Sequence, residues 1–111
     1  MLENKIEKNN KAEIISPQAI HQVAKEHGWW DRERSIPELL CLIHSEISEA
    51  LEGCREHLTE GEDGWLGEEL ADAIIRIFDL CEHEDINILS EVEKKHNKNK
   101  KRKYRHGNKK F

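Results

Sequence analysis

The sequence contains few of the residues that interrupt helices or favour strands. Its 111 residues include only two prolines and six glycines, and valine, threonine and tyrosine are scarce. Glutamate, lysine, leucine, isoleucine and alanine dominate instead, and these residues favour helix over strand. We therefore predict an all-α fold, a helical bundle of about four helices.

Long apolar runs are also missing, and no stretch has the pattern of a signal peptide or a membrane span. The three cysteines, Cys41, Cys54 and Cys81, are an odd number, and each falls on or near an apolar stripe of a predicted helix. This placement indicates buried, reduced thiols and argues against a disulfide framework or a zinc site. Both observations predict a cytoplasmic protein that does not associate with membranes.

The chain is short enough to form one domain with a limited core, because 36% of its residues are hydrophobic and 37% are charged. We expect self-association to complete that core. Within the chain, we predict a flexible N-terminal segment over residues 1–15, a folded domain over 16–98 and a basic C-terminal tail over 99–111.

Acidic residues are absent after Glu93. Residues 1–93 hold all 23 acidic residues and eight of the 18 basic ones, and the other ten basic residues lie between Lys94 and Lys110. A folded body with so many carboxylates implies that cations other than its own lysines neutralise some of them. Metal ions are one candidate, and the basic tail of the chain is another.

Local signals mark the beginnings of four helices. Ser16-Pro17 is a typical start for a first helix, which would end at Gly28. A capping box at residues 35–38 begins the second helix, a third follows over about residues 65–82, and Asp85 would cap a fourth. The apolar positions that these helices are expected to bury are Ile20, Val23 and Ala24; Leu40, Ile43, Ile47, Leu51, Cys54 and Leu58; Leu66, Leu70, Ala73, Ile74, Ile77 and Cys81; and Ile88, Leu89 and Val92.

Two pairs of carboxylates occur at helical spacing. Glu46 and Glu49 are three residues apart in the second helix, and Glu69 and Asp72 are three apart in the third, so each pair projects from one face. On a helical wheel, Glu46 falls inside a mostly apolar arc and away from the solvated face. Antiparallel packing of the two helices would bring the pairs together.

Four facing carboxylates repel one another unless cations neutralise them. Oxygen ligands suit Mg²⁺ or Mn²⁺, and magnesium sites often combine a few carboxylates with substrate phosphates. The pattern therefore indicates phosphoryl chemistry, in which metal ions neutralise and orient a triphosphate and activate a water. A solvated helix face with intrahelical salt bridges is the simpler explanation for any single pair of this kind.

The ordered motifs Glu46-x-x-Glu49 and Glu69-x-x-Asp72, with nineteen residues between them, resemble those of the MazG-like nucleotide pyrophosphohydrolases, in the all-α NTP pyrophosphohydrolase superfamily. The sequence segments around the motifs, at residues 42–52 and 68–76, are also similar to the corresponding segments of the family. Further similar segments are residues 28–30 upstream, and Lys94-x-x-Asn97 and residues 104–107 downstream. The resemblance covers about residues 17–111.

The resemblance implies a helical bundle that forms homodimers or homotetramers. It also implies Mg²⁺-dependent hydrolysis of a (d)NTP between its α and β phosphates, which yields a monophosphate and pyrophosphate. The four motif carboxylates, Glu46, Glu49, Glu69 and Asp72, would be the metal-binding and catalytic residues. Lys94 and Asn97 would approach the phosphates. A specialised nucleotide such as phosphoribosyl-ATP is another substrate found within the superfamily.

Trp30 and Arg76 complete the predicted substrate-binding set. Trp30 could stack on a base, although adjacent tryptophans at a helix end more often pack in a core or an interface. Arg76 could organise the carboxylates or contact a phosphate, but an intrahelical ion pair with Asp72 or Asp79 is the simpler expectation.

The alternative function is that of a non-enzymatic helical interaction module, whose basic C-terminal tail binds nucleic acid or a partner protein. Apart from Tyr104, however, the segment from Lys94 to Lys110 lacks interleaved aromatic residues, and the acidic body would repel a polyanion. We therefore favour the enzyme and expect no nucleic-acid partner.

Overall fold

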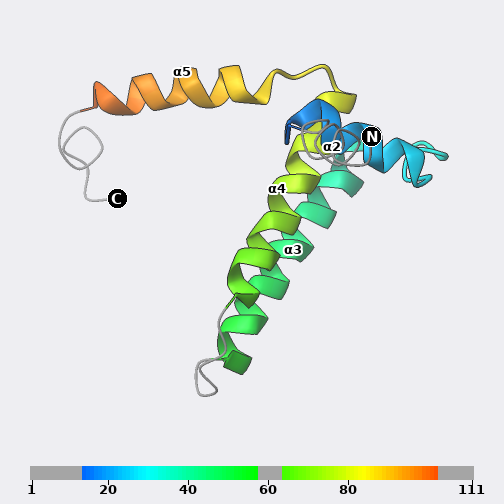
Figure 1. Ribbon diagram of the computed structural model, residues 1–111. Coiled ribbons are helices and arrows are strands. Elements are labelled where there is room, and N and C mark those ends of the chain that lie inside the picture. The colour runs from blue at the N-terminus through cyan, green and yellow to red at the C-terminus, as the bar shows by residue number, and fades with distance from the viewer. Residues whose placement is uncertain (1–13, 58–63, 103–111) are drawn as a thin grey trace, which may run out of the picture.

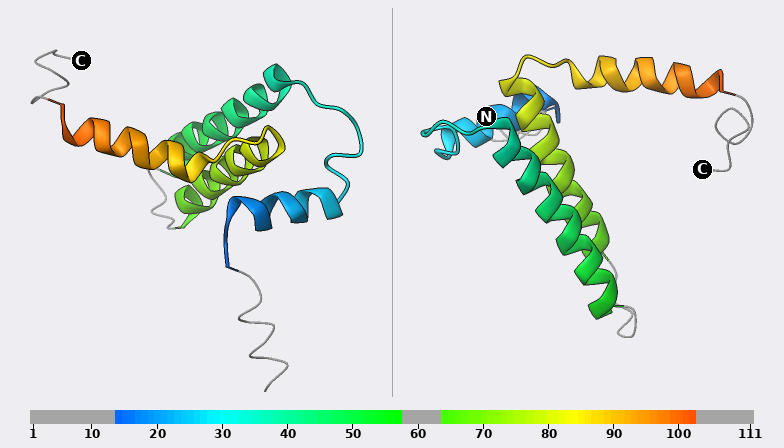
Figure 2. Two further views of the ribbon diagram at one scale, coloured as in Figure 1. Left: turned by 90° about the horizontal axis from the view of Figure 1, so that it is seen from above. Right: turned by 180° about the vertical axis from the view of Figure 1, so that it is seen from behind.

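The computed structural model describes residues 14–57 and 64–102. This part of the chain is all-α, as predicted, with no strand, and its helices are α2 (Pro17–Glu26), α3 (Ile36–His57), α4 (Trp65–His83) and α5 (Ile88–Lys100). α3 and α4 lie side by side as an antiparallel hairpin, and α2 packs against α4 at the end of the hairpin where α3 begins (Figures 1 and 2). No described helix is long and apolar enough to cross a membrane.

The first helix begins and ends as its sequence signals indicate. The Ser16 side chain accepts a hydrogen bond from the Ala19 N–H at 3.0 Å, and Pro17 occupies the first turn. After α2 ends, Gly28 takes a left-handed conformation (φ +83°), and the Trp29 N–H donates back to the Ala24 carbonyl at 3.0 Å. This arrangement closes the helix and turns the two tryptophans of residues 29–30 back towards the hairpin.

Half of the predicted capping box forms at the start of α3. The Ser35 hydroxyl accepts a hydrogen bond from the Glu38 N–H at 3.2 Å. The Glu38 carboxylate, however, pairs with the guanidinium groups of Arg32 and Arg34, and these arginines lower the pKa of Glu38, chiefly through the Arg32 hydrogen bond. The helix start therefore also fixes the connection that precedes it.

The prediction that Asp85 caps the fourth helix is wrong. Asp85 has a positive φ of 55° and ends α4, since the Ile86 N–H donates to the Cys81 carbonyl at 2.8 Å. Asn87 caps α5, and its side chain accepts from the Ser90 N–H at 3.1 Å. Asp85 is used in ending α4 and lies two residues before Asn87, so Asn87 is the residue whose side chain reaches a free N–H in the first turn of α5.

The hairpin buries only part of the apolar stripes that the sequence predicted: Ala73 and Cys81 are buried as expected, whereas most of the bulkier positions are exposed. Its buried apolar residues are Leu39, Ala50, Ala73, Leu80 and Cys81. Small residues at the contact let α3 and α4 approach closely, and the bulkier stripes remain outside. The positions expected to be buried that are exposed in the single chain are Val23, Leu40, Ile47, Leu51, Leu66, Leu70, Ile74, Leu89 and Val92.

The cysteine prediction is right in part. All three thiols are free, and Cys81 is buried, which raises the pKa of its thiol. Cys41 is exposed, because it lies on a side of α3 that no described helix covers. Most of the predicted flexible segment, most of the basic tail and Leu58 lie outside the described residues.

The Trp65 ring of α4 lies against Gly53 of α3, where an added Cβ would lie 2.6 Å from ring carbon Cζ3. We expect Gly53→Ala to lower the free energy of unfolding by about 1–3 kcal/mol, although alanine is intrinsically the better helix former. Denaturation followed by circular dichroism measures this. Gly67→Ala is the matched control: no atom lies within 4 Å of its Cβ position, so stability should rise slightly. If both variants were equally stabilised, close packing at Gly53 would be ruled out.

Candidate metal centre

Three carboxylates meet across the hairpin. Glu46 and Glu49 project from α3 and Glu69 projects from α4, and one oxygen of each lies within 4.8 Å of the other two. Glu46 is only 8% exposed, Glu69 is half-buried and Glu49 is exposed. Helical spacing and antiparallel packing therefore gather three of the four carboxylates named from the sequence.

Glu69 is the least satisfied member of this cluster. Its Oε2 atom is buried and has no hydrogen-bond partner among the described residues. Burial, followed by the charges of Glu49, Asp72, Glu46 and Glu68, raises the pKa of the Glu69 carboxyl. A cation bound between these oxygens would relieve both the burial and the repulsion.

Asp72, the fourth predicted carboxylate, lies one turn after Glu69 and is exposed. It stands outside the group of three oxygens but close enough for its charge to raise the pKa of Glu69. It also shares the lining of a neighbouring cleft with Glu46. The structure therefore places all four carboxylates in one region, with Asp72 on the cleft side.

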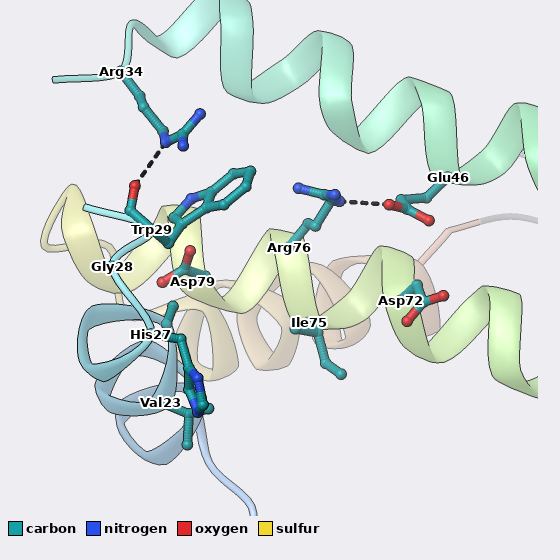
Figure 3. Close-up of a pocket in the computed structure, with 11 residues that line it drawn as sticks. Val23, His27, Gly28, Trp29, Arg34, Glu46, Asp72, Ile75, Arg76 and Asp79 are labelled. Atoms are coloured by element: carbon teal, nitrogen blue, oxygen red, sulfur yellow. Dashed lines mark hydrogen bonds and ion pairs between the residues drawn. The ribbon is translucent and has the colours of Figure 1, made fainter. Parts of the chain in front are cut away.

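That cleft has a volume of about 490 Å³ and lies between α2, the connection that follows it and α4 (Figure 3). Val23, Ala24 and Trp29 supply apolar surface, and Glu46 connects the cleft to the carboxylate cluster. Cavities of this size accommodate small molecules. A ligand held at the carboxylates could therefore extend into a partly apolar pocket.

Arg76 joins the cleft to the cluster. Its Nε donates to Glu46 Oε1 at 2.6 Å, so its ion pair crosses from α4 to α3, and the simpler expectation of an intrahelical pair is wrong. Of the two intrahelical candidates, Asp72 is exposed, and Asp79 already binds Trp30 and His21, so the buried Glu46 carboxylate is the partner that Arg76 takes. The Trp29 ring lies between two cations, 3.6 Å from Arg34 Cζ and 5.0 Å from Arg76 Cζ (Figure 3).

Trp30 lies outside the cleft lining. Its ring stacks on His83, with centroids 3.8 Å apart and planes 4° from parallel, and its Nε1 donates to Asp79 Oδ1 at 3.0 Å. His21 Nδ1 lies 2.6 Å from the same oxygen. Of the two tryptophans, Trp29 is therefore the one that a ligand in the cleft would meet.

Several residues in and near the cleft belong to no motif that sequence reasoning could have found. His21 is 58 positions from Asp79, and no local pattern connects them. Arg34 carried no motif either. Asp79 could have been included, since it continues the edge of Asp72 and Arg76 on a helical wheel.

Lys94 and Asn97, the predicted phosphate contacts, are exposed on α5. This helix leaves the hairpin at the end where α2 lies and projects away from it (Figures 1 and 2). Lys94 and Asn97 line a separate depression on α5 together with Lys98 and Lys101. Within one chain, the structure does not bring them to the carboxylates.

No family model, curated protein or solved structure matches this chain.

Proposed function

We propose that this protein is a Mg²⁺-dependent pyrophosphohydrolase of nucleoside triphosphates that converts a (d)NTP to a (d)NMP and pyrophosphate, with Mn²⁺ as an alternative metal. The observation that carries the proposal is the meeting of Glu46, Glu49 and Glu69, with one oxygen of each within 4.8 Å of the others. The resemblance of the two carboxylate motifs to those of the MazG-like enzymes supports the same reaction.

The residues fit a hard divalent cation. Their donor atoms are carboxylate oxygens, the ligand type that Mg²⁺ and Mn²⁺ prefer, and Glu69 contributes a buried oxygen with no hydrogen-bond partner in the part of the chain that the structure describes. We propose Glu46, Glu49, Glu69 and Asp72 as the ligands. When bound, the metal would neutralise the triphosphate charge and make a water acidic enough to attack.

The neighbouring side chains supply position and charge. Arg76 holds the Glu46 carboxylate in one orientation through its 2.6 Å ion pair, which keeps a ligand oxygen directed at the cluster. Its guanidinium also gives the cleft a positive charge beside the carboxylates, suited to a phosphate oxygen. The cleft walls would then receive the nucleoside.

We also propose that the protein self-associates. The stripes on α3 and α4 leave large apolar side chains in water, with Leu51 57% and Ile47 50% exposed on α3 and Ile74 49% exposed on α4. Apolar surface of this extent favours burial against another subunit. A homodimer or homotetramer would provide that burial.

Self-association would also bear on Lys94 and Asn97. Within one chain, α5 does not bring these residues to the carboxylates, but α5 of a second copy could bring its own Lys94 and Asn97 to the phosphates.

We expect light scattering coupled to size exclusion to give a dimer or tetramer mass for the wild type and a monomer mass for an Ile47→Glu, Leu70→Glu double variant. The reason is that each substitution places a charge in surface that association would bury. Glu56→Gln, an exposed change on α3, should keep the wild-type mass. A monomeric wild type at micromolar concentration would contradict this part of the proposal.

The reaction is tested by measuring pyrophosphate and monophosphate released from a panel of NTPs and dNTPs, with Mg²⁺ and with EDTA. Phosphoribosyl-ATP is included as the specialised alternative. Metal-dependent release of both products is expected from at least one triphosphate. If folded protein with Mg²⁺ released pyrophosphate from none of the panel, the proposed reaction would be rejected.

One observation favours the alternative of an interaction module. Every residue of α5 from Glu91 onwards is exposed, and four lysines of the helix, Lys94, Lys95, Lys98 and Lys100, face solvent. This alternative predicts salt-sensitive binding to a nucleic acid or an acidic protein that needs no Mg²⁺ and is lost when residues 98–111 are removed.

A further inference from the structure

Asp79 is a buried carboxylate that the proposed metal centre does not use. It is 7% exposed, lies on α4 and borders the cleft (Figure 3). Two donors converge on its Oδ1 atom: Trp30 Nε1 at 3.0 Å and His21 Nδ1 at 2.6 Å. The His21 side chain is itself only 12% exposed, and His83 stacks on the Trp30 ring. Packed rings therefore fix the carboxylate in place.

Both donors bind the same oxygen of Asp79. Among the described residues, no donor is assigned to Oδ2. An ion pair that served only to tie α2 to α4 would not need to border a cleft. Because Asp79 lines this cleft, its second oxygen can accept a hydrogen bond from a bound molecule. A carboxylate held in this way is a preorganised acceptor.

The position of Asp79 along α4 relates it to the metal centre. It follows Asp72 by seven residues, which corresponds to about 10.5 Å along a helix axis. If the carboxylates hold the triphosphate through a metal, the nucleoside must extend from that end of the cleft. Val23, Ala24 and Trp29 provide apolar surface there, which suits the faces of a base. Asp79 then lies where the polar edge of the base would be.

We propose that Asp79 reads the base and selects nucleotides whose base carries an exocyclic amino group over those of uracil and thymine. This inference rests on the proposed function, because the triphosphate sets the direction of the nucleoside. A carboxylate only accepts hydrogen bonds. Cytosine and adenine present an amino donor. In uracil and thymine the single ring N–H lies between two carbonyl oxygens, which would face the carboxylate and repel it.

The test measures nucleotide binding in the absence of turnover. Binding of non-hydrolysable α,β-imido analogues of dCTP, dATP, dTTP and dUTP, with Mg²⁺, is followed by calorimetry on the full chain. We expect dCTP and dATP analogues to bind at least about tenfold more tightly than dTTP and dUTP analogues, because a site built around a polar contact discriminates strongly against a ligand that cannot make it. In Asp79→Asn, whose amide can donate to a carbonyl, the ratio should fall towards one or reverse.

Asp85→Asn is the control, because it removes the same charge from an exposed position outside the cleft, and it should keep the wild-type ratio. If Asp79→Asn does not fold, the proposal is tested by the wild type alone, through the ratio of its affinities for the dCTP and dATP analogues to those for the dTTP and dUTP analogues. Equal affinities in the wild type, or no binding of any analogue, would overturn the role of Asp79. Selective binding without pyrophosphate release would reject the proposed reaction and leave the role of Asp79 standing.

Discussion

Glu49→Gln is expected to lower the kcat/KM for pyrophosphate release by roughly two to four orders of magnitude, with unchanged helical content. The substitution removes one negative charge and one ligand oxygen from the cluster, and metal-mediated charge stabilisation is worth several kcal/mol. Glu49 is exposed, and no ion pair joins it to another described residue. Its loss should therefore affect turnover without disturbing packing. A coupled pyrophosphate assay and circular dichroism measure the two effects.

Glu56→Gln is the matched control, since it makes the same change at an exposed position further along α3, and it should retain wild-type activity. Asp72→Asn should behave like Glu49→Gln. Glu46→Gln is less informative, because it also disrupts the ion pair with Arg76. Full activity in both Glu49→Gln and Asp72→Asn would show that the cluster is not the catalytic site.

Divalent metal is expected to raise the melting temperature more at pH 7 than at pH 4.5, and Glu69→Gln should abolish much of this difference. The pKa of Glu69 is raised in the folded protein above its ordinary value of 4.5. The stability that this group contributes is therefore fully present below pH 4.5 and is lost as the pH rises through the folded-state pKa. Metal binding requires the deprotonated carboxylate, so it restores stability where the free protein has lost it.

The measurement is a thermal melt at half-unit pH steps, with Mn²⁺ and with EDTA, for the wild type and Glu69→Gln. Metal at a hundredfold excess over its Kd should stabilise the wild type by about 2.7 kcal/mol at neutral pH. Other carboxylates titrate in the same range, so the difference between the two proteins isolates Glu69. If Glu69→Gln kept the wild-type profile in both conditions, neither the raised pKa nor a ligand role could be assigned to Glu69.

The helix positions could largely be predicted from the sequence, because the capping residues that begin a helix bind backbone groups only a few positions away. Ser16-Pro17 and Ser35 begin their helices through short-range hydrogen bonds that need no tertiary contact. The predicted start of α5 was wrong. Asp85 takes part in the turn that ends α4, and Asn87 is the residue that caps α5. Which of two neighbouring Asx residues caps a helix depends on how the preceding helix ends, and that is not a local property.

The carboxylate cluster was also predictable, whereas the packing face was predicted only in part, at Ala73 and Cys81. Spacing of three residues on adjacent antiparallel helices is enough to bring Glu46, Glu49 and Glu69 together. On a helical wheel of α3, the most hydrophobic face is the one that carries Leu40 and Ile47, so hydrophobicity predicts that this face is buried. The helices instead meet where Gly53 and other small residues permit close approach. Contacts such as His21 with Asp79 join segments 58 residues apart, and only the assembled fold reveals them.

α5 has 13 residues, none of them buried. A helix of that length without tertiary packing is marginally stable in water and forms through its own helix–coil equilibrium. Protection of amide hydrogens from exchange with solvent should then divide the molecule into two cooperative units. The amides of α3 and α4 would exchange only when the hairpin opens, and those of α5 would exchange freely until another surface covers the helix.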